Sequence, residues 1–184
     1  MSYITKLNYD EALPENQEAF RREEEVRGKP SNMKATLLHS VPAHRAYMEW
    51  YPLWNEVKSL LGLRGAVLYA HAISSTNNCL LCTTYFRKAL TDLGLTPDKF
   101  EITPEEEPVV QLGYAAARHA QPIDPALWKT LKARFSEKDL VNLVAFAGLM
   151  VATNLFNNLV QVDVDDILTP YLPHGAVAEE ADVS

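Results

Sequence analysis

The chain has 184 residues, 47% of them hydrophobic and 22% charged, which suits one folded domain with its own core. Its formal net charge is −7 and it has no basic cluster, so binding to nucleic acid or to an anionic membrane surface is disfavoured. The first residues lack the apolar segment of a signal peptide, and the longest apolar run, residues 143–152, is about half a bilayer span. We therefore expect a cytoplasmic protein whose thiols start reduced.

Helix signals recur along the chain, whereas the alternating pattern of strands is almost absent. Near the N-terminus, Pro14 and Gly28 bound a charged helix that we place on the outside, and Ser31 caps the next helix. Residues 42–62 form a further helical stretch, which Pro52 breaks because it removes a donor and crowds the preceding turn.

The middle of the chain holds two apolar helices. The first, over residues 63–75, is apolar almost all round, and the second is capped by Asn77 or Asn78 and closed by Gly94. A linker follows over residues 95–108 and separates two helical halves.

Three more helices complete the chain, over residues 109–121, 125–135 and 136–160. Asp124 caps the second of them, and Ser136 with Asp139 gives the third a start like a capping box. The fold class predicted is an all-α single-domain bundle of seven to eight helices. It divides into an N-terminal arm and outer helix (1–30), a helical core (31–168) and an acidic C-terminal tail (169–184), of which we expect residues 174–184 to fray.

The only two cysteines, Cys79 and Cys82, lie three positions apart at the start of a predicted helix. Unpaired N–H groups there favour thiolate, and this spacing brings two sulfurs within reach of a disulfide. One thiolate then attacks and its neighbour resolves the adduct, which is dithiol redox chemistry. The alternative is a pair of buried cysteines acting as small hydrophobic residues.

Two other cysteine chemistries fit less well. Structural zinc needs two more ligands, and the histidines of the chain show no paired ligand spacing. No βαβ pattern surrounds the CxxC, which argues against a thioredoxin-type site.

The segment "AHAISSTNNCLLCTTYF" resembles the central motif of the carboxymuconolactone decarboxylase family, most closely that of its alkylhydroperoxidase (AhpD-like) branch. In that branch a helix ending in Ser-x-x-Asn-x runs into Cys-x-x-Cys. The residues in register here are Ser74, Asn77, Cys79 and Cys82. The resemblance extends on both sides and covers most of residues 3–165.

The resemblance implies an all-helical fold that assembles into dimers, trimers or hexamers. It also implies reduction of a hydroperoxide by the cysteine pair, with electrons returned by a dihydrolipoamide-like or thioredoxin-like thiol donor. No metal or bound organic cofactor is required. The family usually gives the first attack to the second cysteine, Cys82, whereas the helix dipole favours Cys79, so both assignments stay open.

The active branch also carries a glutamate and a histidine as a proton relay, and here Val67 and Phe86 stand at those positions. His71, one helical turn after Val67, is a candidate catalytic substitute, because its ordinary pKa suits proton exchange near neutrality. The alternative is a histidine that only packs in an apolar helix. An upstream carboxylate, Glu49 or Glu56, is a further candidate.

Apolar surface beyond the core points to a homo-oligomer. The last helix has too little polar surface for one face in water, and an aromatic cluster near Pro52 suits either an interface or a corner of the core. The cluster contains Tyr47, Trp50, Tyr51 and Trp54.

The first function predicted is therefore a thiol-dependent peroxide reductase or dithiol oxidoreductase. Because the relay residues are missing, a second alternative is a redox sensor or a purely structural protein with the same fold. A decarboxylase or lactone-processing enzyme of the parent family is the third alternative, although that branch does not use a CxxC.

Overall fold

The computed structural model describes residues 2–119 and 122–173. These residues form eight α-helices and two short 3-10 helices, and they contain no strand, so the all-α prediction is confirmed. The α-helices are α1 (Pro14–Arg27), α2 (Asn32–Leu37), α3 (Val41–Met48), α4 (Trp50–Thr76), α5 (Leu80–Asp92), α6 (Glu107–Ala117), α7 (Pro125–Arg134) and α8 (Glu137–Val160), and the 3-10 helices are η1 (Tyr9–Glu11) and η2 (Asp166–Tyr171). The acidic end predicted to fray, from residue 174 on, lies outside the described residues.

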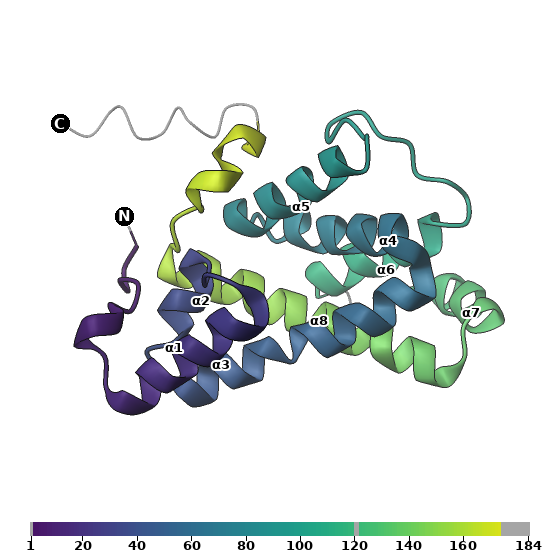
Figure 1. The fold of residues 1–184 in the computed structure, drawn as a ribbon. Coiled ribbons are helices and arrows are strands. Elements are labelled where there is room, and N and C mark those ends of the chain that lie inside the picture. Colours follow the sequence, from purple (N-terminus) through teal and green to yellow (C-terminus); the bar gives the residue numbers. More distant parts are fainter. Residues whose placement is uncertain (1, 120–121, 174–184) are drawn as a thin grey trace.

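The long helix α4 lies at the centre and packs against α8, α5 and α6 (Figure 1). At Gly62 its backbone is not helical, with φ of 71°, which a glycine adopts without strain. The predicted helix end at Gly62 is therefore confirmed, although the two halves follow each other closely. Neighbouring helices cover the half of α4 after Gly62, as the burial of Ala66, Tyr69 and Ile73 shows. This coverage explains why that half is apolar on nearly all sides.

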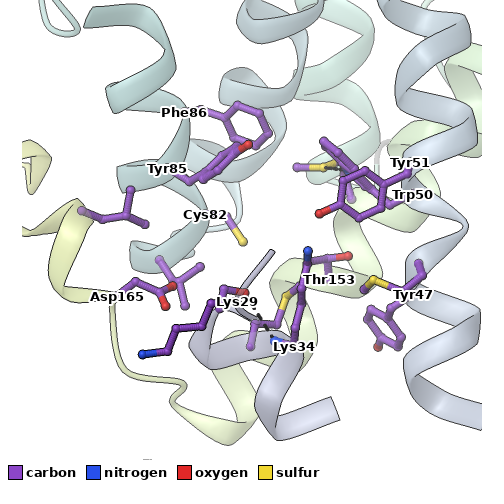
Figure 2. Close-up of a pocket in the computed structure, with 16 residues that line it drawn as sticks. Lys29, Lys34, Tyr47, Trp50, Tyr51, Cys82, Tyr85, Phe86, Thr153 and Asp165 are labelled. Atoms are coloured by element: carbon purple, nitrogen blue, oxygen red, sulfur yellow. Dashed lines mark hydrogen bonds between the residues drawn. The ribbon is translucent and has the colours of Figure 1, made fainter. Parts of the chain in front are cut away.

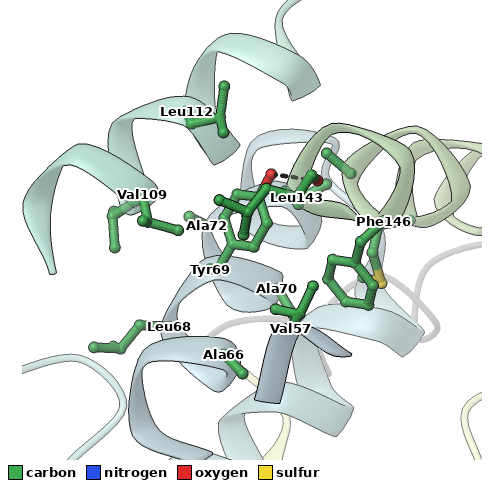
Figure 3. Packing of buried hydrophobic residues seen from close by; sticks show 14 of the residues in the cluster. Val57, Ala66, Leu68, Tyr69, Ala70, Ala72, Val109, Leu112, Leu143 and Phe146 are labelled. Carbon is green, nitrogen blue, oxygen red and sulfur yellow. Dashed lines mark hydrogen bonds between the residues drawn. The ribbon is translucent and has the colours of Figure 1, made fainter. Parts of the chain in front are cut away.

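The core is built around Tyr69 of α4, which is fully buried between α6 and α8 (Figure 3). Its hydroxyl donates a hydrogen bond of 2.9 Å to the carbonyl of Leu143, so the one polar atom of the ring is satisfied. Gly113 of α6 faces the ring, and a Cβ there would lie only 3.0 Å from Tyr69 Cδ2. Glycine at this position allows α6 to approach α4 closely.

By length and composition alone, α8 is long and apolar enough to cross a membrane. In the bundle, one face of it packs against α4 through Leu143 and Phe146. Its second half also buries polar residues, among them Asn154 and Asn157, while Leu155 on another face is 55% exposed. The apolar run of residues 143–152 is thus buried along one face of α8.

The two ends of the described chain lie against the same part of the bundle (Figure 1). The C-terminal segment η2 packs on α5, where the Arg87 Nε donates a hydrogen bond of 2.9 Å to the Tyr171 carbonyl. At the N-terminal side, α1 packs against α3, and Ser31 caps α2 by accepting a bond from the Lys34 amide, as predicted.

Candidate active site

The turn between α4 and α5 sets the position of the cysteines. Asn77 ends α4 and Asn78 takes a left-handed conformation with φ of 51°, so the N-cap of α5 is Cys79. The prediction of an asparagine cap was wrong. The chain must reverse direction before α5 begins, and asparagine tolerates the left-handed conformation that this reversal requires.

Side-chain amides tie this turn to two other helices. The Asn77 side chain donates a hydrogen bond of 2.9 Å to the Ala117 carbonyl at the end of α6. Its oxygen accepts one of 3.1 Å from Asn154 of α8, and Asn154 in turn accepts from the Ser74 hydroxyl. Ser74 and Asn77, which carry part of the family resemblance, therefore fix the backbone that presents the cysteines.

Cys79 and Cys82 are both free thiols, 1% and 5% exposed, and they contact each other. The Cys82 amide donates a hydrogen bond of 3.4 Å to the Cys79 sulfur. A hydrogen bond from the Cys82 thiol lowers the pKa of Cys79, and the same bond, together with burial, raises the pKa of Cys82. The first negative charge of the pair is therefore held on Cys79, with the remaining proton on Cys82.

Asn157 of α8 is the third member of this group. Its Nδ2 donates a hydrogen bond of 3.1 Å to the Cys82 sulfur and also lies 3.4 Å from the Met33 sulfur. Hydrogen bonding by the same amide lowers the pKa of both cysteines, so it stabilises either thiolate. Within the described part of the chain, the buried Asn157 Oδ1 has no hydrogen-bond partner and is free to accept one.

Cys82, but not Cys79, lines a cavity of about 200 Å³, which we name the Cys82 cavity. Figure 2 shows its sulfur pointing into the space between Tyr85 and Phe86 on one side and Lys34 and Tyr51 on the other. The walls come from the 28–31 loop, α2, α3, α4, α5, α8 and the residues around η2. Access from this cavity therefore favours Cys82 as the attacking thiol.

The predicted aromatic cluster forms one wall of the Cys82 cavity. Tyr47, Trp50 and Tyr51 line it, and Trp50 stacks on Trp54 with ring centroids 5.0 Å apart. Phe86, at the position of the missing relay histidine, is also part of the lining, whereas Val67 belongs to the hydrophobic core. In the cavity, Phe86 thus presents an apolar ring where the resemblance implies a proton-transfer histidine.

A buried charge cluster adjoins the cavity. Glu23 of α1 has a fully buried side chain, whose two oxygens lie 2.7 Å from Arg27 Nη1 and 2.7 Å from Lys34 Nζ. His44 Nε2 lies 3.4 Å from the same carboxylate, and its pKa is lowered chiefly by burial. We name Glu23, Arg27, Lys34 and His44 the Glu23 cluster, and only its Lys34 lines the cavity.

His71 lies in another environment from that of the two cysteines. Its ring packs edge-on against Phe100, with centroids 5.8 Å apart, and it does not line the Cys82 cavity. Burial, followed by the charge of Arg87, lowers its pKa to about 4, with Asp98 opposing. The imidazole is therefore neutral at pH 7, and its role in a proton relay stays a prediction.

The lowered pKa of His71 predicts acid sensitivity of the fold. Between about pH 6.5 and 4 the unfolded chain binds a proton that the folded chain does not, so stability is complete above pH 6.5 and falls as the pH drops. Allowing for partial exposure, we expect the loss to be about 2 kcal/mol. Urea denaturation at pH 7 and pH 4.5 measures it, and His71→Gln should flatten the dependence. An unchanged dependence in that variant would assign the effect to other groups.

Three residues of this site escaped the sequence analysis: Glu23, Lys34 and Asn157. Glu23 lies in the charged run "RREEEVR" and carries no pattern of its own, whereas Asn154 and Asn157 interrupt an apolar helix at helical spacing, a signal for an inward polar pair. Glu56, one of the carboxylates considered, instead pairs with Lys138 at the surface, 3.1 Å apart. Across residues 2–119 and 122–173, no group of three or more acidic, histidine or cysteine side chains is placed to hold a metal ion.

The sequence matches no family profile and no curated protein. Its fold is similar to that of an uncharacterized peroxidase-related protein from Silicibacter sp. TM1040, with 18% identity, a TM-score of 0.69, and coverage of 89% of this chain and 93% of that one. A second, an AhpD-core peroxidase-related protein from Ralstonia eutropha JMP134, gives 17% identity, a TM-score of 0.71 and coverage of 91% and 94%.

A third similar structure is that of the debrominase Bmp8, with 17% identity, a TM-score of 0.68, and coverage of 91% of this chain and 95% of that one. A cysteine-to-alanine variant of Bmp8 has been solved in complex with 2,3,4-tribromopyrrole. At these identities the likeness shows the fold. The AhpD-like fold implied by the sequence resemblance is therefore confirmed.

Proposed function

We propose that this protein is a thiol-dependent reductase of small organic hydroperoxides that uses Cys82 and Cys79. The observation that carries the proposal is the hydrogen-bonded pair of free thiols with one member, Cys82, facing a cavity. The fold shared with two peroxidase-related proteins supports it. The chemistry proposed needs no metal and no bound organic cofactor.

The step starts with one proton shared by the two sulfurs. The proton passes from Cys82 to the Cys79 thiolate, and the Cys82 thiolate, held by the Asn157 amide, attacks the outer oxygen of the hydroperoxide. The O–O bond breaks, the alkoxide takes a proton from water and leaves as an alcohol, and Cys82 becomes a sulfenic acid. The Cys79 thiol then attacks the Cys82 sulfur, which releases water and forms the disulfide.

Return to the dithiol requires two electrons from outside the chain. We assign this to a dihydrolipoamide-like or thioredoxin-like thiol, in the cytoplasm, where small thiols are kept reduced. We also propose a homo-oligomer, because α8 exposes apolar side chains on the face away from the core: Val141, Val144, Leu155 and Leu159.

Counting free thiols tests the proposed function. The reduced chain has two thiols, and one equivalent of cumene hydroperoxide should remove both, with an intramolecular disulfide in the mass spectrum. Steady consumption of peroxide with dihydrolipoamide then identifies an enzyme rather than a redox sensor. Two thiols that survive excess peroxide in the folded chain would refute the proposal and leave a structural role.

A second candidate is reductive dehalogenation of a small aromatic compound. The aromatic walls of the cavity and the similarity to the debrominase Bmp8 favour it. A thiolate that attacks a ring bromine leaves a ring carbanion, which takes a proton, while the sulfenyl bromide reacts with the second thiol to give the disulfide and bromide. Release of bromide from tribromopyrrole, with loss of both thiols, separates this candidate from peroxide reduction.

Asn157 is expected to act as a positioning residue for the attacking sulfur. Its replacement in Asn157→Ala removes the hydrogen bond to Cys82, which raises the pKa of the thiol pair and should slow peroxide reaction about tenfold. A pH profile of thiol alkylation measures the pKa directly. Asn142→Ala, which removes an exposed amide of α8 that bonds Glu56, is the matched control and should change neither quantity. An unshifted alkylation profile in Asn157→Ala would contradict the role.

The same assays test His71. Because His71 is absent from the cavity lining, we expect His71→Gln to keep peroxide turnover within about twofold of the parent. A tenfold loss with intact folding would instead establish the relay predicted from the sequence.

A further inference from the structure

One end of the Cys82 cavity carries a surplus of positive charge. Among the ionised groups that line this end or pair with its lining, Arg27, Lys29 and Lys34 are cations, while Glu23 and Asp165 are anions. Three positive and two negative charges leave a net charge of +1, in a chain whose formal total is −7. Burial raises the pKa of the Asp165 carboxyl, and one of its oxygens accepts a hydrogen bond of 2.8 Å from the Asn32 amide.

Of the two lysines that line the cavity, Lys29 is exposed, whereas the side chain of Lys34 is only 11% exposed. Glu23 holds its ammonium at 2.7 Å, and the ammonium also lies over the Tyr51 ring, 4.9 Å from the centroid. Arg27 lies over the same ring at 4.4 Å and bonds the other oxygen of Glu23. Glu23 carries one negative charge and pairs with two cations, Arg27 and Lys34. It therefore fixes Lys34 in place and leaves one of the two positive charges uncompensated.

This ammonium faces the reactive sulfur across an apolar space. Figure 2 shows Lys34 and Tyr51 on the side of the cavity opposite Cys82. An ammonium has three N–H donors, and a ligand in the cavity has access to those not directed at Glu23. Trp50 and Phe86 also line the cavity and suit a flat ring, and an apolar cavity of about 150 Å³ is known to hold one benzene ring.

We infer that the Cys82 cavity takes a small organic anion, with its carboxylate or phenolate at Lys34 and its reacting atom at Cys82. The inference rests on the proposed function for treating this ligand as a substrate, and it narrows the substrate class to acidic hydroperoxides or acidic halogenated rings.

Benzoate and its neutral analogue benzamide are the probes. Binding to the full-length reduced chain is followed by tryptophan fluorescence, since Trp50 lines the cavity. We expect benzoate to bind about tenfold more tightly than benzamide. Lys34→Gln should remove that preference, Lys34→Arg should keep it, and Lys138→Gln, which removes a surface lysine with a 76% exposed side chain, should leave it unchanged.

Three outcomes would overturn the inference: no binding of benzoate, equal binding of both probes, or equal weakening of both probes in Lys34→Gln. If Lys34→Gln fails to fold by circular dichroism, the salt dependence of the parent decides, because an ionic contact weakens with salt for benzoate and not for benzamide. Binding is measured without peroxide. A chain that binds benzoate through Lys34 but keeps both thiols under peroxide would therefore refute the proposed function and leave the anion site standing.

Discussion

Replacing Cys82 by serine should lower peroxide turnover by at least a hundredfold. Cys82 lines the cavity, whereas Cys79 is 1% exposed and does not line it. A serine hydroxyl at the same place is a far weaker nucleophile, because almost none of it is ionised near neutral pH. The loss is measured as consumption of cumene hydroperoxide with dihydrolipoamide in excess.

Cys79→Ser is the matched variant, since it removes the partner thiol and leaves the attacking one. It should still react once with peroxide and should accumulate a sulfenic acid on Cys82, which a dimedone-type reagent traps, but it cannot form the internal disulfide. If instead Cys82→Ser accumulates a sulfenic acid on Cys79 and Cys79→Ser does not react, the two assignments exchange. Full turnover in Cys82→Ser would refute the role of Cys82 as the attacking sulfur.

Replacing Phe146 by alanine should cost about 3–5 kcal/mol of unfolding free energy. The ring is fully buried at the point where α8 crosses α4. Its centroid lies 5.7 Å from the Trp50 ring, 5.8 Å from the Trp54 ring and 5.9 Å from the Tyr69 ring, so its removal leaves a void shared by several aromatic side chains. Urea denaturation at pH 7 measures the change.

Val26→Ala is the control for this prediction. Val26 is 63% exposed on α1, and its truncation should change stability by less than about 0.5 kcal/mol. A loss below about 1 kcal/mol in Phe146→Ala would show that the helices close the void, and therefore that this part of the core is not rigidly packed. Because Trp50 also lines the Cys82 cavity, benzoate binding should weaken in Phe146→Ala even where the chain remains folded.

Helix boundaries were largely predictable because their signals are local. Pro14, Asp124 and the Ser136–Asp139 pair each act within one turn of the helix that they start, and each begins the helix predicted from it. The start of α5 was not predictable in the same way. There the two asparagines that resemble caps serve the reversal of the chain, and a cysteine, which is not among the preferred N-cap residues, takes the cap position.

The candidate site was half predictable. Cys79 and Cys82 are only three positions apart at the start of a helix, so their contact follows from local geometry alone. The Glu23 cluster, by contrast, joins α1, α2 and α3, and Asn157 reaches Cys82 across 75 positions of the chain. Such partners are set by how the helices pack, and a lone glutamate in a charged run gives no sign that its side chain is fully buried.

The origin of the cavity walls has an evolutionary consequence. The sulfurs and the amides that hold them belong to the central helices, whereas Lys29 and Lys34 come from near one end of the chain and Asp165 and Leu168 from near the other. Substitutions in these terminal segments can therefore change which compounds the cavity admits, while the cysteine pair and the amides that hold it stay unaltered. Sequence divergence in this fold should then appear first in the terminal segments. Related proteins would share the same cysteine pair and differ in the compounds that they bind.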